Sequence, residues 1–206
     1  MDNSENAGSL EEYKKKRDFK QTSEPTGDEK IDGRMKNQFV IQKHDASNLH
    51  YDFRLQIEDV LVSWAVPKGP STDPSEKRLA IRTEDHPLQY GNFEGVIPED
   101  HYGGGTVLIW DHGTFENIRA NKEEDAVDMS ESLKEGKIEV ELDGKKLKGG
   151  YVLIRTSEAN GNDQDEKWLL KKMKDEHADA RKNPISTEPR SVISDKTIDE
   201  ISEKGE

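Results

Sequence analysis

Hydrophobic and polar residues alternate along short segments from Gln38 onward, a spacing typical of β-strands, whose successive side chains face opposite sides. Turn-forming pairs separate these segments: Glu58-Asp59 predicts a tight hairpin and Asp143-Gly144 a two-residue turn. Many short strands with few helices indicate a mainly β fold, an antiparallel barrel or sandwich. The predicted strands are Gln38–Lys43, Leu49–Ile57, Val60–Val66, Arg78–Thr83, Thr106–Asp111, Gly113–Asn117, Lys137–Leu142, Lys145–Lys148, Tyr151–Arg155 and Lys167–Lys172.

The segments on either side of the strands are more polar. A helical turn or two is predicted within Leu10–Phe19, a short helix over Glu124–Lys134 and a transient one near Ile198–Ile201. From Asp175 onward apolar residues are few, which predicts an acidic tail without a packed structure. We therefore expect four regions: a disordered N-terminus (1–8), an N-terminal segment (9–37), the β domain (38–174) and a disordered acidic tail (175–206).

The composition supports a compact core flanked by solvated segments. Of the 206 residues, 30% are hydrophobic and 36% charged, and 31 Lys and Arg against 44 Asp and Glu give a net charge of −13. Such acidity argues against a protein that coats nucleic acid, although a few placed cations can still hold one or two phosphates. The absence of Cys excludes disulfides and thiolate chemistry. No apolar run has membrane-spanning length, so we expect a soluble, cytoplasmic protein.

The segment around the second predicted strand carries the most informative chemistry. In strand geometry Leu49 to Ile57 place their apolar side chains on one face, and His50, Asp52 and Arg54 on the other. His44 lies before a short turn, so it can fold back beside His50. Two imidazoles and a carboxylate form a metal site that suits Mn²⁺, Fe²⁺, Co²⁺ or Zn²⁺. Arg54 extends this face with a guanidinium that matches a phosphate; the alternative is an edge strand with ordinary surface polar residues.

A second cluster follows over Arg78–Tyr90. Arg78 and Arg82 share one face of a predicted strand, and the loop after it presents His86 and Tyr90. Guanidinium, imidazole and phenol are groups that hold and protonate a phosphoryl oxygen. Taken alone, the His-Pro pair in this loop is also what an ordinary turn contains.

Together these motifs resemble the 3'-phosphoesterase domain of bacterial DNA ligase D, which also exists as a free-standing protein. The segments that carry the similarity are Phe39–Asp52, Trp64–Ser71, Arg78–Tyr90 and Tyr102–Val107, and the similarity covers roughly residues 10–175. The resemblance implies a small closed or partly open β-barrel with short helices and a crescent-shaped active-site groove. It also implies an enzyme that removes a 3'-terminal ribonucleoside as a phosphodiesterase, and then the 3'-phosphate as a phosphomonoesterase.

The resemblance further implies site residues and a cofactor. The expected metal is Mn²⁺, with Co²⁺ or Zn²⁺ as alternatives. The N-terminal segment is expected to pack near the active site. The implied residues are His44, His50 and Asp52 as metal ligands, Arg54, His86 and Tyr90 around the scissile phosphate with Gln42 and Arg78 nearby, and Arg17, Asp18 and Glu24 from the N-terminal segment.

The implied partners are 3' ends of DNA or RNA in a primer-template, together with a separate DNA ligase, polymerase or Ku-type end-joining protein. We expect a monomer with no membrane association. Two other functions stay open at this point: a non-catalytic module that binds a 3'-phosphate, and a metal-dependent small-molecule enzyme on a cupin-like barrel, which needs a small enclosed pocket.

Overall fold

The computed structural model describes residues 10–28, 36–121, 126–157 and 165–203, so the predicted disordered N-terminus (1–8) lies outside the described residues. The strands are β1 (Gln38–Asp45), β2 (Leu49–Ile57), β3 (Val60–Val66), β4 (Arg78–Arg82), β5 (His86–Pro87), β6 (Gly95–Ile97), β7 (Gly105–Asn117), β8 (Lys137–Gly144), β9 (Lys148–Ser157) and β10 (Lys167–Lys172). The helices are α1 (Glu11–Lys15), α2 (Met129–Glu135), α3 (Pro184–Thr187) and α4 (Ile198–Ser202), with 3₁₀ turns η1 (Leu88–Asn92) and η2 (Ile118–Asn121).

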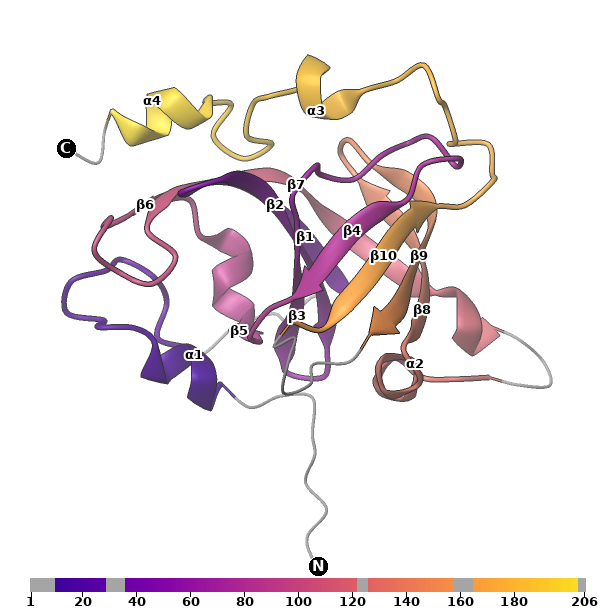
Figure 1. Cartoon of the computed structure of the whole chain (residues 1–206), viewed down its shortest axis with the longest axis horizontal. Helices are drawn as coiled ribbons and strands as arrows, with labels where there is room; N and C mark the ends of the chain where they lie inside the picture. The colour runs from indigo at the N-terminus through magenta and orange to yellow at the C-terminus, as the bar shows by residue number, and fades with distance from the viewer. Residues whose placement is uncertain (1–9, 29–35, 122–125, 158–164, 204–206) are drawn as a thin grey trace, which may run out of the picture.

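The strands form an antiparallel barrel (Figure 1). Their order is β1-β2-β3-β4-β10-β9-β8-β7-β6, β5 pairs with β3, and the additional pairing of β1 with β7 closes 8 strands into the barrel. The predicted mainly β class is therefore confirmed, and the barrel rather than the sandwich is the architecture. None of the helices in the described ranges is long and apolar enough to cross a membrane.

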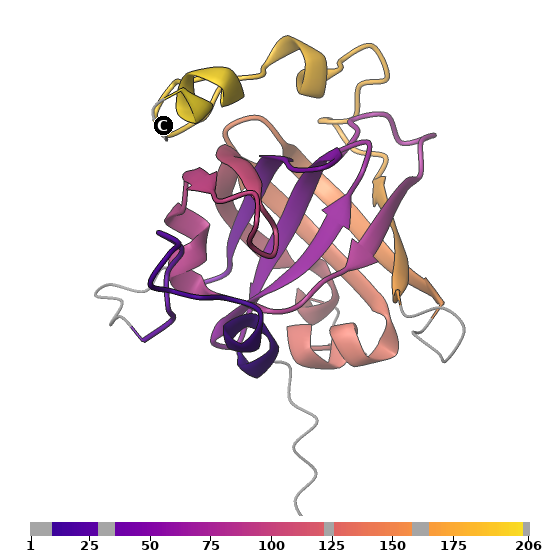
Figure 2. The ribbon, with the colours of Figure 1, turned by 60° about the vertical axis from the view of Figure 1, so that its left-hand side comes forward.

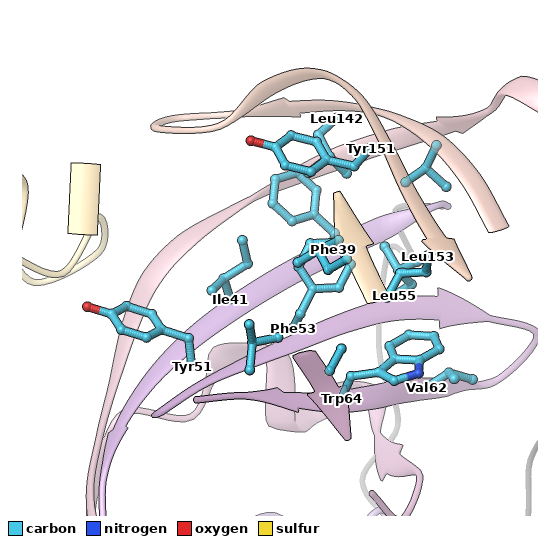
Figure 3. Packing of buried hydrophobic residues seen from close by; sticks show 14 of the residues in the cluster. Phe39, Ile41, Tyr51, Phe53, Leu55, Val62, Trp64, Leu142, Tyr151 and Leu153 are labelled. Carbon is cyan, nitrogen blue, oxygen red and sulfur yellow. The ribbon is translucent and has the colours of Figure 1, made fainter. Parts of the chain in front are cut away.

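The barrel interior is a continuous apolar core, because alternate residues of every strand point inward. Figure 3 shows Phe39, Phe53, Trp64 and Tyr151 converging on this interior from separate strands. Phe53 and Trp64 are 0% exposed, whereas Leu49, at the open end of the same apolar face of β2, is 46% exposed.

A second apolar cluster covers part of the outside of the barrel. It joins Tyr13 of α1 and the segment around η1 to outward-facing residues of β1, β3 and β7; its buried members are Tyr13, Val40, Leu61, Leu88, Tyr90, Phe93, Ile97, Val107 and Ile109. The N-terminal segment and the segment that contains η1 lie side by side in both views (Figures 1 and 2). The outer face of β1 and β2 is therefore not a solvent face where these segments cover it.

Two predicted strand boundaries were wrong. Thr106–Asp111 and Gly113–Asn117 form one strand, β7, because Gly113 lets the chain pass close to the Asp143 backbone and continue. Residues 145–147 are a turn rather than a strand. The Asp111 carboxylate accepts hydrogen bonds from the backbone amides of Lys145, Lys146 and Leu147 at 2.8–3.1 Å, which moves the turn beyond Asp143-Gly144.

The helix predicted over Glu124–Lys134 is shorter in the structure. Residues 122–125 lie outside the described ranges, and α2 begins only at Met129. The Asp128 side chain accepts a hydrogen bond from the Glu131 amide as an N-cap, and Gly136 ends the helix with φ 75°.

The segment from Asp175 to Glu203 differs from the predicted disordered tail, because it follows a defined path along one end of the barrel (Figures 1 and 2). Trp110 Nε1 donates to the Glu188 carbonyl at 2.8 Å, and the Val192 amide donates to the Ile109 carbonyl at 3.0 Å. Ile201 is 7% exposed within the core cluster. The average composition of this segment is polar. It is nevertheless ordered, because a few apolar residues pack on the barrel and backbone groups form hydrogen bonds with it.

Replacing Ile201 with Ala is expected to lower the free energy of unfolding by about 2 kcal/mol, because the change removes a packed aliphatic side chain. Chemical denaturation of the full chain measures this difference. The matched control is Ile193→Ala in the same segment, where the side chain is 58% exposed and the expected change is within about 0.5 kcal/mol. Equal stability of the two variants would show that the segment does not pack on the barrel.

Candidate active site

The candidate site lies on the outer face of β1 and β2. In their antiparallel register His44 lies opposite His50, and Gln42 opposite Asp52, so these side chains share one face. This face is largely covered: His44 is 7%, Asp52 5% and Arg54 3% exposed. A cavity of about 180 Å³ opens beside them, lined also by residues of the N-terminal segment, the loop before η1 and the loop before β7.

His44, His50 and Asp52 form a compact group of potential metal ligands. One ligand atom from each lies within 4.8 Å of the others. His44 Nδ1 is 3.5 Å from one Asp52 oxygen, and His50 Nε2 is 3.6 Å from the other. Two imidazoles and one carboxylate are a donor set that first-row divalent metals accept, so this group can hold such an ion.

Hydrogen bonds fix the orientation of both imidazoles. His44 Nε2 donates to the Gly103 carbonyl at 2.9 Å, and His50 Nδ1 donates to the Asn48 carbonyl at 2.9 Å, because a carbonyl can only accept. In the neutral rings the remaining nitrogens, His44 Nδ1 and His50 Nε2, are therefore the lone-pair atoms, and both face Asp52. Such outer contacts to carbonyls are the usual support of metal-ligating histidines, so the residues present fit a metal.

Arg54 connects the metal-ligand group to the rest of the site. Its guanidinium donates to the Asp52 carboxylate at 3.2 Å, to Gln42 Oε1 at 2.7 Å and to Ser63 Oγ at 2.8 Å. Its Nη1 also lies 2.9 Å from His86 Nδ1, which donates to the Glu84 carbonyl at 2.9 Å. Burial acts to raise the pKa of Asp52, but the Arg54 charge holds it well below its usual range. Asp52 is therefore a carboxylate, the form that a metal requires.

Gln42 positions other groups rather than facing the cavity. Its Nε2 donates to the carbonyls of Tyr90 and Phe93 at 3.0 and 2.9 Å, and its Oε1 accepts from Arg54. The amide thus ties the η1 segment to the barrel and fixes the Arg54 guanidinium. Gln42, which the sequence predicts near the phosphate, therefore supports the site and is not among the residues that line the cavity.

His86 lies between two guanidiniums. Arg54 contacts its Nδ1, and Arg17 Nη2 lies 3.4 Å from its Nε2. Burial lowers the pKa of His86 well below its usual value, and the charges of Arg54 and Arg17 lower it further. The imidazole is therefore neutral at neutral pH. These three side chains, of which the two guanidiniums are charged, line one side of the cavity and are called the cationic wall below.

The N-terminal segment contributes Arg17 to this wall, and Glu24, which does not itself line the cavity, supports Arg17. Arg17 Nε donates to Glu24 at 2.9 Å, and its Nη1 donates to Glu84 at 3.2 Å. Tyr90 donates its hydroxyl to Glu24 at 3.0 Å, and burial together with the Glu24 charge raises the pKa of Tyr90 well above its usual value. Glu24 thus holds Arg17 and Tyr90 in place.

Two predicted site residues lie away from the cavity. Asp18 is exposed, and its carboxylate accepts from the Lys20 amide and the Gln21 side chain within a local turn. Arg78 is at the start of β4, where its guanidinium pairs with Glu76. Neither residue lines the cavity.

The structure also brings to the site several residues that are not among those predicted from the sequence. Glu84 pairs with Arg17, the Gly103 carbonyl orients His44, Ser63 holds Arg54, and Tyr102 and Lys16 lie at the rim. A signal existed for Glu84, which precedes His86 by two residues in an extended segment. A signal existed for Ser63 as well, because the predicted two-residue turn at Glu58-Asp59 places it opposite Arg54 across the hairpin.

A β-barrel that gathers two imidazoles, a carboxylate and two guanidiniums around one cavity has the features of a phosphoryl-binding protein with a candidate metal centre. The family model of the DNA Ligase D 3'-phosphoesterase domain matches residues 42–155. The chain belongs to this family.

Full-length relatives are much longer than this chain. It is 45% identical over 192 residues to the multifunctional non-homologous end joining protein LigD of Pseudomonas aeruginosa, covering 92% of this chain and 22% of that protein. It is 42% identical over 170 residues to the multifunctional non-homologous end joining DNA repair protein LigD of Mycobacterium tuberculosis, covering 82% of this chain and 20% of that protein. The chain thus spans about a fifth of the length of these relatives.

Proposed function

We propose that this protein is a metal-dependent phosphoesterase that acts on 3' ends of nucleic acids. It removes a 3'-terminal ribonucleoside as a phosphodiesterase and then the remaining 3'-phosphate as a phosphomonoesterase, leaving a 3'-hydroxyl for repair. The observation that carries the proposal is the direct hydrogen bond between Asp52 of the metal-ligand group and Arg54 of the cationic wall, within one cavity. Membership of the 3'-phosphoesterase family supports the same reaction class.

In this proposal His44, His50 and Asp52 hold the metal, Mn²⁺ being the expected ion and Co²⁺ or Zn²⁺ the alternatives. A divalent ion held there supplies Lewis-acid chemistry at a phosphoryl oxygen. The open cavity rim suits the terminus of a polymer, whereas a small-molecule enzyme needs an enclosed pocket.

Arg54 and Arg17 stabilise the charge on the phosphoryl oxygens. Arg54 Nη2 carries two N–H groups and donates one of them to Asp52, so within the described residues the second is available to a phosphate oxygen. A phosphate between the two guanidiniums offsets their charge and raises the pKa of His86. His86 is then able to pass a proton to the leaving oxygen. Tyr90, whose hydroxyl donates to Glu24, acts on the phosphate through Arg54, whose guanidinium lies 4.9 Å from the centre of its ring.

The relatives are named for non-homologous end joining, and we propose that this chain prepares ends for the same process. Removing a ribonucleoside and a 3'-phosphate produces the terminus that a ligase or polymerase requires. A separate DNA ligase, polymerase or Ku-type protein is the expected partner.

The test uses a labelled primer-template with one 3'-terminal ribonucleotide, incubated with the full chain and Mn²⁺. The expected result is stepwise conversion to a 3'-phosphate and then a 3'-hydroxyl, with both steps stopped by a chelator. Binding of the end without release of nucleoside or phosphate, across several metals, would replace the enzyme with the non-catalytic 3'-phosphate-binding module.

Replacing Arg17 with Ala is expected to slow the diesterase step about a hundredfold, the scale of losing one charge-stabilising donor, and the monoesterase step much less. Arg17 contacts His86 from the side opposite Arg54, where a departing nucleoside would lie, and it has no direct contact with the metal-ligand group. Separate initial rates on the two substrates measure this ratio.

The control for this prediction is Lys15→Ala, an exposed cation of the same N-terminal segment, which should leave both rates unchanged. Thermal unfolding of each variant separates loss of folding from loss of chemistry. Equal slowing of the two steps by Arg17→Ala would contradict the division of labour.

A further inference from the structure

Tyr102 is an exposed aromatic residue at the rim of the candidate active site. It lines the cavity, yet 48% of the residue is exposed, whereas Tyr90 in the same cavity is 2% exposed. It belongs to the loop that leads into β7, where Gly103 adopts φ 75°, a left-handed conformation that favours glycine. Neither the metal-ligand group nor the cationic wall uses this ring.

The position of the Tyr102 ring is fixed although its surface is open. On one side the neighbouring Gly103 carbonyl accepts from His44. On the other, the Tyr102 hydroxyl donates to Glu84 at 3.3 Å and receives a hydrogen bond from Lys16 at 3.3 Å. An exposed ring that is held from two sides is a preformed surface for a flat ligand.

Cations lie next to this ring. Lys16 Nζ is 4.5 Å and Arg17 Cζ 5.7 Å from the ring centroid. Arg17 also contacts His86, so one guanidinium lies next to both the ring and the cationic wall. A nucleotide offers both matching parts, an anionic phosphate and a flat base.

We propose that the Tyr102 ring is the stacking surface for the nucleobase of the terminal nucleotide. This inference rests on the proposed function, and it adds a nucleobase subsite to a site otherwise defined by phosphate and metal chemistry. Stacking on an aromatic ring accepts every base, because each base has a π-face. The subsite therefore contributes affinity for an end with a base, without choosing its sequence.

The competing role for Tyr102 is that of a latch, which joins the N-terminal segment to the β7 loop through its hydroxyl. Two substitutions separate the roles. Tyr102→Phe keeps the ring and loses the hydrogen bonds to Glu84 and Lys16, whereas Tyr102→Leu keeps the apolar bulk and loses the π-face. Stacking predicts damage from Leu alone, and a latch predicts damage from both.

The kinetic test compares two substrates, a 3'-terminal ribonucleotide and the same end whose terminal ribose lacks a base. Tyr102→Leu is expected to raise KM for the base-bearing end about tenfold, equivalent to about 1.4 kcal/mol of stacking. The abasic end should show the same KM in this variant and in the unmodified protein, and Tyr102→Phe should behave as the unmodified protein on both. Equal effects of Leu on the two substrates, or equal effects of Phe and Leu, would overturn the subsite.

A second measurement does not depend on turnover. The native Trp64, Trp110 and Trp168 are each 0% exposed, so the indole introduced by Tyr102→Trp provides an exposed fluorophore against a buried background. Titration with adenosine 3'-monophosphate is expected to quench its emission saturably, and ribose 5-phosphate is expected not to. No quenching by the nucleotide, in a protein that still releases phosphate from 3' ends, would overturn the subsite and leave the proposed function standing. Failure of the proposed function itself would instead appear as no phosphate release by the unmodified chain.

Discussion

Substituting His50 with Ala is expected to abolish both the diesterase and the monoesterase step. It is also expected to weaken Mn²⁺ binding by more than about a hundredfold, because the loss of a single outer-shell contact already lowers metal affinity about ten- to a hundredfold. His50 Nε2 faces the Asp52 carboxylate, and its Nδ1 is engaged by the Asn48 carbonyl, so no other side chain in the described site replaces it. Because the His50 side chain is 22% exposed, its removal creates no enclosed cavity in the protein. Activity assays and calorimetric titration with Mn²⁺ measure the two effects.

The matched control is His177→Ala, an exposed imidazole that lies 3.6 Å from the exposed Glu176 carboxylate. This variant should keep the activity and the Mn²⁺ affinity of the unmodified protein. If His50→Ala kept tight Mn²⁺ binding while losing activity, the three-residue group would not be the metal centre. Retention of both properties would remove His50 from the site altogether.

The β fold was predictable because strand periodicity is local. Alternation in β2 was enough to place Phe53 and Leu55 in the core and His50 and Asp52 on the other face, as the structure has them. Barrel closure was not predictable in this way. It depends on the pairing of β1 with β7, far apart in sequence, and on a register shift between Ile41 and Gln42 that no local pattern reveals.

In the candidate site, too, the features set by local sequence were predictable and those set by distant segments were not. The pairing of His44 with His50 follows from one short hairpin, so the sequence was sufficient to predict it. The burial of Arg54 was not predictable from its own strand, where it alternates like a solvent-facing residue. It is buried because Tyr90 and the N-terminal segment cover it, and their approach depends on the second apolar cluster outside the barrel.

The largest combined effect on stability and activity is expected from Arg54→Lys. Lysine keeps the charge but presents one ammonium point instead of a planar fork, so it cannot reach Gln42, Ser63, His86 and Asp52 together. Incomplete pairing of buried Asp52 is expected to lower the free energy of unfolding by about 3 kcal/mol. Loss of the Nη2 contact with the phosphate is expected to lower kcat by about a hundredfold or more. Chemical denaturation and initial rates measure the two effects.

The control is Arg181→Lys. This side chain is 91% exposed and pairs with Asp179 at the surface, so neither quantity should change. The two measurements on Arg54→Lys separate the two roles of this residue. A stability loss with kcat unchanged would make Arg54 a support for Asp52 that does not touch the phosphate. A loss of kcat with full stability would show that the hydrogen bonds to Gln42 and Ser63 contribute little to folding, and that the guanidinium acts mainly on the substrate. The geometry favours both losses together, because the same planar group joins the carboxylate of the metal-ligand group to the imidazole of the cationic wall.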